Sequence, residues 1–275
     1  MPSLVTRYIG TDFGTIVYYL HRNPAQSTTI LYIHGLGDNR KWFPKHFKTY
    51  SLDRFSWIVP DLLGHGDSSK SDKVRAYTMK QQAKFLAAIL EKEQVKDLSI
   101  LAHSMGGPIA ISLIEQLACQ KPRRTTLRLL FYLEGNLDAG DALLSSQVAE
   151  MAFSDFELSF ESWSKGILGD SEDEFLVQYV AAVREAGPFT IWASCRDLVP
   201  TSVKGDLLTR LMAHLDFSVY FIFGEKNKGV YTSESKVREA QLPLLILPEA
   251  GHGLHTENPS YFWGTMFELA QKNYA

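Results

Sequence analysis

Short runs of apolar residues alternate along this chain with longer segments in which apolar residues recur every three or four positions. The short runs are typical of buried strands, and the longer segments are typical of amphipathic helices. Strands are predicted at 4–9 and 14–22, which form an opening hairpin, and within 28–37, 55–60, 97–104, 128–135, 217–224 and 242–249. Helices are predicted around 41–50 and at 80–94, 108–120 and 258–273. This alternation indicates an α/β fold, with a mostly parallel central sheet and helices on both faces.

The pattern changes between residues 138 and 205. This stretch is rich in helical patterns and aromatic residues, and it contains no convincing strand. It is interpreted as a helical cap inserted into a core that residues 1–137 and 206–275 form together.

Composition and charge narrow the classes of function. Of the 275 residues, 45% are hydrophobic and 21% are charged, which is typical of a globular protein. The formal net charge of −3 and the pI near 6.2 give no electrostatic reason to expect nucleic acid or a membrane as a partner. The first residues lack a signal-like apolar segment, and no apolar run reaches about 18 residues, so a cytoplasmic protein is expected. We expect a small-molecule substrate and a monomer or homodimer.

The two cysteines, Cys119 and Cys195, are expected to be reduced thiols. Neither lies in a CxxC motif or near a group of histidines, which are the usual signs of a metal site. We therefore expect no metal and no cofactor.

The segment LAHSMGG, residues 101–107, places Ser104 between a predicted strand and a predicted helix. A serine on such a tight turn is held in a strained backbone conformation that exposes its hydroxyl group. The turn needs small neighbours, and Ala102 and Gly106 stand at the two positions written as glycine in GxSxG. A serine before a helix is more often only a helix cap, so the motif depends on the rest of the chain.

The order of several motifs makes the chain resemble the α/β-hydrolase superfamily. A strand ending in the His34-Gly35 turn, the PDLLGHGDS loop at 60–68, the Ser104 turn, a cap and a late histidine follow in the family's order over nearly the whole chain. The resemblance implies a catalytic triad in the chain order serine, acid, histidine. It also implies an oxyanion hole formed by the backbone amides of Leu36 and Met105. Asp38, in the same turn, is expected to cap the following helix.

His252 is the predicted general base among eight histidines. It lies in the glycine-flanked segment PEAGHGLHTENP, just after the last predicted strand, where the family has its base. His255 is three residues away and is the nearest alternative. His103 is expected to point away from the site and to pack beneath the serine turn.

The position of the acid is unusual. The family's common pattern GExD reads GEKN here, which puts Asn227 in the acid's place. Some relatives, including haloalkane dehalogenases, carry the acid at the end of the strand after the serine helix, and Glu134 stands there in this chain. Glu134 is therefore the predicted acid, displaced to that strand. Glu225 and Asp138 are alternatives, and a site that works with Asn227 and no acid also remains open.

A serine nucleophile excludes the alkyl-enzyme chemistry of relatives with an aspartate at that position. The resemblance implies a serine hydrolase of the carboxylesterase type, acting on a small, partly apolar ester, thioester or lactone through an acyl-enzyme. His34, Trp163 and Trp192 are predicted pocket residues. Hydrolysis or lysis of a carbon-carbon bond by the same triad, and a ligand-binding protein without catalysis, are the alternative functions.

Overall fold

The computed structural model describes residues 4–274 and contains one eight-stranded sheet. The strand order is β1-β2-β4-β3-β5-β6-β7-β8, in which β2 pairs antiparallel with β1 and β4 and all other pairs are parallel. The mostly parallel α/β fold predicted from the sequence is confirmed. The strands are β1 Val5–Thr11, β2 Gly14–His21, β3 Thr28–Ile33, β4 Ser56–Pro60, β5 Asp97–His103, β6 Thr126–Leu133, β7 Ser218–Gly224 and β8 Leu244–Leu247.

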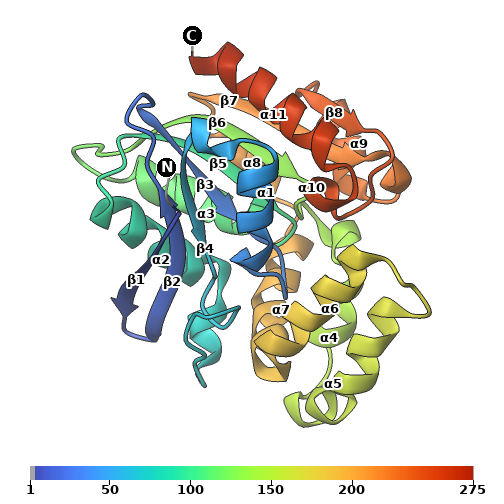
Figure 1. The fold of residues 1–275 in the computed structure, drawn as a ribbon. Helices are drawn as coiled ribbons and strands as arrows, with labels where there is room; N and C mark the ends of the chain where they lie inside the picture. Colours follow the sequence, from blue (N-terminus) through green and yellow to red (C-terminus); the bar gives the residue numbers. More distant parts are fainter. Residues whose placement is uncertain (1–3, 275) are drawn as a thin grey trace.

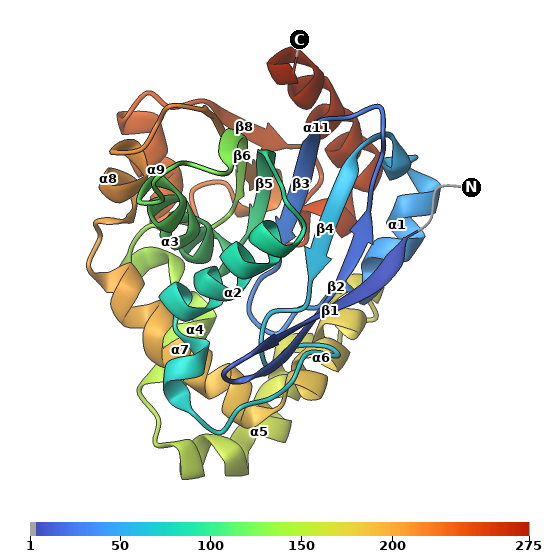
Figure 2. The same ribbon diagram turned by 90° about the vertical axis from the view of Figure 1, so that its left-hand side faces the viewer.

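Helices cover both faces of the sheet. Helices α2 (Met79–Lys92) and α3 (Gly106–Ala118) lie on one face, and α1 (Phe43–Thr49) and α11 (Pro259–Tyr274) lie on the other, as Figures 1 and 2 show. Strand β3 is buried along its whole length and contributes to two hydrophobic clusters. Leu31 and Ile33 belong to the cluster with α2 and α3, whereas Ile30 and Tyr32 belong to the cluster with α1 and α11. This alternation follows from the two-residue period of a strand, and burial on both faces explains its uninterrupted apolar sequence.

Four helices lie together below the main body of the molecule in Figure 1: α4 (Leu143–Ala149), α5 (Phe153–Leu168), α6 (Glu174–Ala186) and α7 (Pro188–Val203). They fall within the stretch predicted as a cap, and no strand of the described chain occurs there. Their apolar residues Val148, Phe156 and Ile191 belong to the same hydrophobic cluster as α2 and α3. The division into a core and a cap remains a prediction.

Three short helices were not predicted: α8 (Leu207–Met212), α9 (Thr232–Glu239) and α10 (Leu254–Glu257). None exceeds eight residues, so each has few turns in which a helical period can appear in the sequence. Helix α10 begins two residues after His252 and shapes the loop that carries this histidine.

A buried ion pair holds the turn after β3. The guanidinium group of Arg40 pairs with Asp61, and both side chains are almost fully buried. Asp61 also accepts hydrogen bonds from the backbone N–H groups of Arg40 (2.7 Å) and Asp67 (2.8 Å). A buried carboxylate requires such partners, so Asp61 fixes the segment that follows the glycine turn at residues 35–37.

Candidate active site

Ser104 follows β5 and precedes α3, on a turn with strained backbone. Its φ angle of +53° lies in the left-handed region, which is unfavourable for any residue with a Cβ atom. The Ser104 amide donates to the carbonyl oxygen of Leu133 at 3.0 Å and so ties the turn to the end of β6. A Cβ atom at Gly106 would lie 2.3 Å from the carbonyl oxygen of Ile33, so the close approach of α3 to β3 requires glycine there.

The glycine turn after β3 lies against the serine turn. A Cβ atom at Gly35 would be 3.0 Å from the Cβ and 3.5 Å from the Oγ of Ser104. Leu36 lines the cavity next to Ser104, and Met105 directly precedes the first residue of α3. Between residues 4 and 274, no acceptor is found for the backbone amide of either Leu36 or Met105. Free amides beside a nucleophile are the donors that an oxyanion hole needs, and their role remains a prediction.

Glu134 and His252 are in direct contact. The Nδ1 atom of His252 lies 2.7 Å from Oε2 of Glu134, and the carboxylate side chain is fully buried. With a proton on Nδ1, the imidazole donates to the carboxylate and keeps Nε2 as an acceptor. Glu134 has a φ angle of +41°, a strained conformation at the end of β6. The strained backbone turns this charged side chain toward the histidine loop, which accounts for a glutamate after an apolar strand.

Two further donors hold the Glu134 carboxylate. The backbone amide of Gly224 donates to Oε1 at 2.7 Å, and the side-chain amide of Asn227 donates to Oε2 at 2.8 Å. Oε2 therefore accepts from both Asn227 and His252. The asparagine at the family's usual acid position contacts the Glu134 carboxylate, and no contact between Asn227 and His252 occurs in the described chain.

The alternative acids lie elsewhere. Glu225 is exposed and accepts a hydrogen bond from the backbone amide of Glu249 at 3.0 Å. Asp138 caps the short helix after it and pairs with Lys236 at 2.8 Å. Of the acids considered from the sequence, Glu134 is the one whose carboxylate contacts His252 in the described structure.

Replacing Asn227 with alanine is expected to lower kcat about tenfold, because one hydrogen bond to a charged group contributes about 1.5–3 kcal/mol. Gly224 and His252 still hold the carboxylate, so the loss should be partial. The measurement is the hydrolysis rate of p-nitrophenyl acetate. Lys226→Ala, at an exposed neighbouring position, is the matched control. A loss of about four orders of magnitude, as expected when the acid of a triad is replaced by an amide, would show that Asn227 itself performs the acid's role.

His103 lies beside His252, which corrects the expectation that it packs beneath the serine turn. Its Nε2 atom is 2.9 Å from the carbonyl oxygen of His252, the two rings are 4.7 Å apart, and His103 lines the cavity. Burial lowers the pKa of His103 to about 3. Burial also holds the pKa of His255 well below its ordinary value. Both are neutral near pH 7, so neither adds positive charge beside the predicted base.

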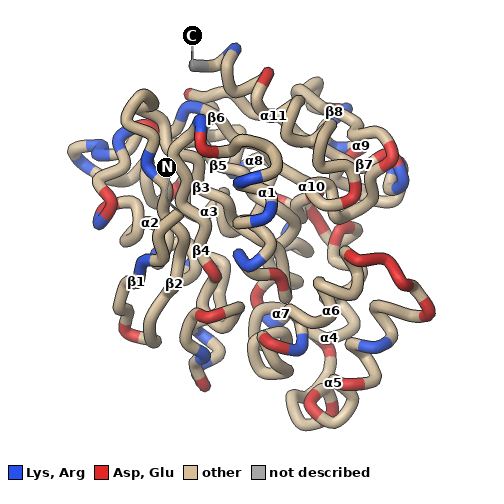
Figure 3. Tube along the Cα trace, in the orientation of Figure 1, with Lys and Arg blue, Asp and Glu red and all other residues tan. Residues whose placement is uncertain are grey.

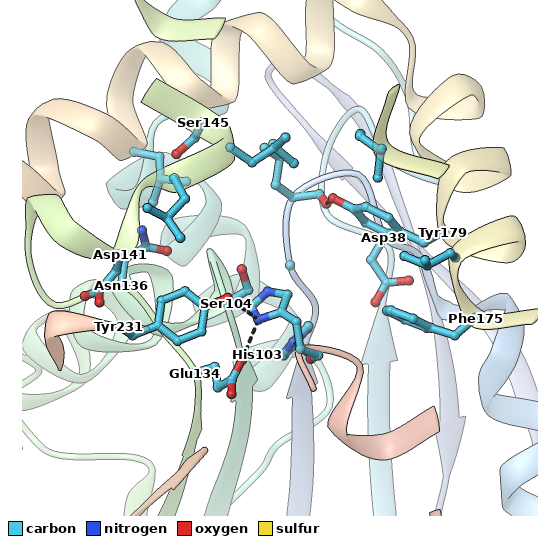
Figure 4. A pocket seen from close by; sticks show the side chains of 18 residues that line it. Asp38, His103, Ser104, Glu134, Asn136, Asp141, Ser145, Phe175, Tyr179 and Tyr231 are labelled. Atoms are coloured by element: carbon cyan, nitrogen blue, oxygen red, sulfur yellow. Dashed lines mark hydrogen bonds and ion pairs between the residues drawn. The ribbon is translucent and has the colours of Figure 1, made fainter. Parts of the chain in front are cut away.

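A cavity of about 250 Å³ opens beside Ser104 (Figure 4). The ends of β3, β5 and β6 form one side of it, and helices α4 to α7 form the other. Its apolar lining consists of Leu36, Leu143, Leu144, Ile167, Phe175, Leu176, Tyr179, Leu198 and Tyr231.

The structure corrects all three predicted pocket residues, because none of them lines this cavity. Trp163 packs against Phe156 and Phe160, and the indole of Trp192 donates to the carbonyl oxygen of Met151 at 2.9 Å. The ring contacts of Trp163 are thus within α5, whereas Trp192 on α7 packs against Phe153 at the start of α5. His34 is fully buried, and its Nε2 accepts from the amide of Leu62 at 2.9 Å.

Two tyrosines of the cavity were missed from the sequence. The hydroxyl oxygen of Tyr231 lies 3.3 Å from Nδ1 of His252, and the hydroxyl of Tyr179 donates to the carbonyl oxygen of Leu36 at 3.0 Å. Burial raises the pKa of both phenols, so they stay protonated near pH 7. Tyr179 is 143 positions from its partner, a contact that no local sequence pattern indicates.

Asp38 also lines the cavity, and it does not cap the following helix as expected. That role belongs to Asn39, whose side chain accepts from the amide of Lys41 at 2.9 Å. Asp38 accepts one hydrogen bond, from the Asn39 amide to Oδ1 at 2.7 Å. Burial raises the pKa of its carboxyl group to about 7.

In residues 4–274, no three His, Cys, Asp or Glu side chains come together as a metal site would require. None of the helices in the same range has both the length and the apolar character needed to cross a bilayer.

Comparisons with known proteins agree with this architecture. The model of the alpha/beta hydrolase family matches residues 30–263. The uncharacterized hydrolase YugF of Bacillus subtilis (strain 168) is 27% identical over 259 residues, which cover 90% of this chain and 91% of YugF. The esterase EaEST from Exiguobacterium antarcticum superposes with a TM-score of 0.76 at 14% identity, covering 97% of this chain and all of that one. The N-acyl homoserine lactonase AidH superposes with a TM-score of 0.73 at 17% identity, with 98% of each chain covered.

Proposed function

Because this chain belongs to the α/β-hydrolase family, we propose that it is a serine hydrolase of small carboxylic esters and lactones. Its relatives and structural neighbours include hydrolases and esterases. In this proposal Ser104 is the nucleophile, His252 the general base and Glu134 the acid of the triad. The observation that carries the proposal is the 2.7 Å contact between His252 and Glu134 in the cavity that Ser104 lines.

The first half-reaction forms an acyl-enzyme. Oγ of Ser104 bonds to the carbonyl carbon of the ester while its proton passes to Nε2 of His252. The Leu36 and Met105 amides stabilise the oxyanion, an effect on the order of 3 kcal/mol for each donor. The bond to the leaving oxygen then breaks, and His252 returns the proton to the departing alcohol.

The second half-reaction regenerates the enzyme. Water attacks the acyl carbon and gives a proton to His252. The Ser104 ester bond then breaks as His252 returns that proton to Oγ, and the carboxylic acid is released. Throughout both steps the buried Glu134 carboxylate keeps Nδ1 protonated and stabilises the imidazolium ion. With a lactone, the leaving alcohol stays attached to the acid, and the same steps open the ring.

The cavity favours a small substrate. Its volume of about 250 Å³ is below the roughly 300–1,000 Å³ of most ligand pockets. Its lining is mainly apolar, which suits a short acyl chain. Two structural neighbours are a lactonase and an esterase, which supports including both substrate classes in the proposal.

A phosphate ester that reacts covalently with serine nucleophiles tests the role of Ser104. Diethyl p-nitrophenyl phosphate is expected to transfer its diethylphosphoryl group to Oγ of Ser104, with loss of p-nitrophenolate, and to abolish hydrolysis of p-nitrophenyl acetate. Mass spectrometry of tryptic peptides should find the added group on the peptide that contains Ser104. Labelling on another residue, or full activity after labelling, would contradict the proposal. A protein that only binds ligand should neither hydrolyse the ester nor react.

A further inference from the structure

The cavity beside Ser104 has carboxylates but no cationic side chain. Its lining includes Asp38, Glu134 and Asp141, and among the described residues around it there is no lysine or arginine. Glu134 is bound by His252, Asn227 and the Gly224 amide. Asp141 accepts from the amides of Leu137, Asp138 and Ser233 at 2.7–3.1 Å. Both of these carboxylates are therefore satisfied by the protein.

Asp38 is different, because only one of its oxygens has a partner. The Asn39 amide binds Oδ1, and no donor to Oδ2 is found in residues 4–274. A carboxylate oxygen that faces a mainly apolar cavity needs a donor from solvent or from a bound ligand. Asp38 thus has the acceptor capacity that the other two acids lack.

Two aromatic rings flank Asp38. Figure 4 shows its carboxylate between Phe175 and Tyr179, across the cavity from Glu134 and Tyr231. The rings of Phe175 and Tyr179 are 6.1 Å apart and nearly parallel, at an angle of 16°. The faces of aromatic rings attract cations, and a carboxylate beside such rings adds a full negative charge.

These three residues also separate the cavity from a neighbouring one. Asp38, Phe175 and Tyr179 line a second cavity of about 420 Å³ next to the first. Lys41 and Lys45 border this second cavity, but they pair with Glu185 and Glu174 on α6. A group held at Asp38 would therefore lie between the apolar interior and the outer space, which suits the leaving alcohol rather than the acyl chain.

The charge of the residues predicted as the cap also favours a cationic ligand. Residues 138–205 contain twelve Asp and Glu and four Lys and Arg, a formal charge of −8 in a chain whose net charge is −3. Figure 3 shows several of the acidic positions along α5, α6 and the segment between them. An acidic cover over a cavity raises the local concentration of cations and lowers that of anions.

We propose that Asp38, with Phe175 and Tyr179, forms a subsite for a cationic group, so that the enzyme prefers esters whose alcohol portion carries an ammonium group. This inference rests on the proposed esterase function and specifies its substrate class. Asp38 would act as a specificity-determining residue and take no part in the bond-making steps.

Two esters of equal shape test the subsite. Acetylcholine has a positively charged nitrogen where 3,3-dimethylbutyl acetate has a neutral carbon. We expect the wild type to favour the cationic ester by about tenfold or more in kcat/KM, and Asp38→Asn to bring the ratio close to one. Asp72→Asn removes an exposed charge outside the cavity and should keep the wild-type ratio. A wild-type ratio near or below one would overturn the inference, even though hydrolysis of the neutral ester would still support the esterase function.

A binding measurement makes the test independent of turnover. In the Ser104→Ala protein, titration calorimetry should show acetylcholine binding about tenfold or more tightly than the neutral ester, and Asp38→Asn in that background should equalise the two affinities. Equal affinities before the Asp38 change would refute the subsite, whatever the catalytic result. Thermal unfolding of each variant checks that the isosteric changes leave the fold intact.

The pH dependence of the preference gives a further check. Because the pKa of Asp38 is raised to about 7, the carboxylate is charged above that pH and neutral below it. The ratio of kcat/KM for the cationic ester to kcat/KM for the neutral ester should fall as the pH drops through about 7. Any pH dependence of the catalytic steps cancels in this ratio because it is common to both esters. The charged and titratable groups around Asp38 are Tyr32, Asp61 and Tyr179, with Lys41, Lys45, Glu185 and His255 around the outer cavity. A ratio that rises with acidification would contradict the assignment.

Discussion

Ser104→Ala is expected to lower kcat for p-nitrophenyl acetate by about a millionfold, as removal of a triad nucleophile does in other serine hydrolases. The variant loses the atom that bonds to the acyl carbon, whereas the cavity and the amides of Leu36 and Met105 stay in place. Ligand binding should therefore persist while turnover disappears. The measurement is p-nitrophenolate release at saturating ester, together with ligand affinity by calorimetry.

A surface serine provides the control for this loss. Ser162→Ala, on the exposed face of α5, removes the same hydroxyl group outside the cavity and should hydrolyse the ester like the wild type. Residual activity of Ser104→Ala within tenfold of the wild type would show that another nucleophile performs the reaction. A protein that serves only as a ligand receptor would instead show no turnover in any variant and unchanged affinity.

Glu134→Gln is expected to lower kcat by about four orders of magnitude, the loss seen when the acid of a triad becomes an amide. The carboxylate accepts from Gly224 on Oε1 and from Asn227 and His252 on Oε2. If the glutamine oxygen keeps the Gly224 bond, its NH₂ group faces the donors of Asn227 and His252. The imidazole would then carry its proton on Nε2, which faces Ser104, and this nitrogen could not accept the hydroxyl proton.

Glu225→Gln is the matched control, since Glu225 is the rival acid in the GEKN segment. Its exposed side chain bonds to the Glu249 amide and makes no contact with His252 in the described structure, so kcat should stay near the wild-type value. The reverse result, a collapse in Glu225→Gln with an active Glu134→Gln, would move the acid to the loop after β7. Equal kcat values in Glu134→Gln and wild type would mean that the reaction proceeds without a charged acid.

A contact in the structure explains why the GEKN segment has an asparagine where the family usually has its acid. From the sequence, Asn227 stands where the family has its acid, and either loss of function or a displaced acid would explain it. In the structure its side-chain amide donates to Glu134, 93 positions earlier in the chain. A carboxylate at position 227 would meet Glu134 with like charge, so an amide is the side chain that suits a carboxylate at the end of β6.

Local sequence patterns were sufficient to predict the strands, the longer helices and the serine turn. Strand β3 and helix α3 were recognised because uninterrupted apolar runs and helical periodicity follow from burial within one segment. The need for glycine at 106 was also readable, since the motif records a close approach of two backbones. Helix α9 was not predicted, because its eight residues contain few turns to show a period, whereas the seven-residue α1 was predicted from the wider amphipathic stretch at 41–50.

The composition of the cavity could not be read from the sequence. The aromatic character of the cap suggested Trp163 and Trp192, yet these rings pack against other aromatic side chains while Phe175, Tyr179 and Tyr231 line the cavity. All five are aromatic residues in or next to helices. Which of them faces the cavity depends on the rotation and position of each helix against its neighbours, and tertiary packing sets both.

The sequence by itself determined the fold class, the family and the position of Ser104 on its turn, because each depends on residues adjacent in the chain or on motif order. Only the tertiary structure decided which acid contacts His252, which residues line the cavity and that Asp38 has an open acceptor. Glu134 and His252 are 118 positions apart, and the neighbouring strands β6 and β7, with the loop after β8, bring them to 2.7 Å. Contacts between distant segments follow from strand order and loop conformation, which a linear pattern of residue types does not specify.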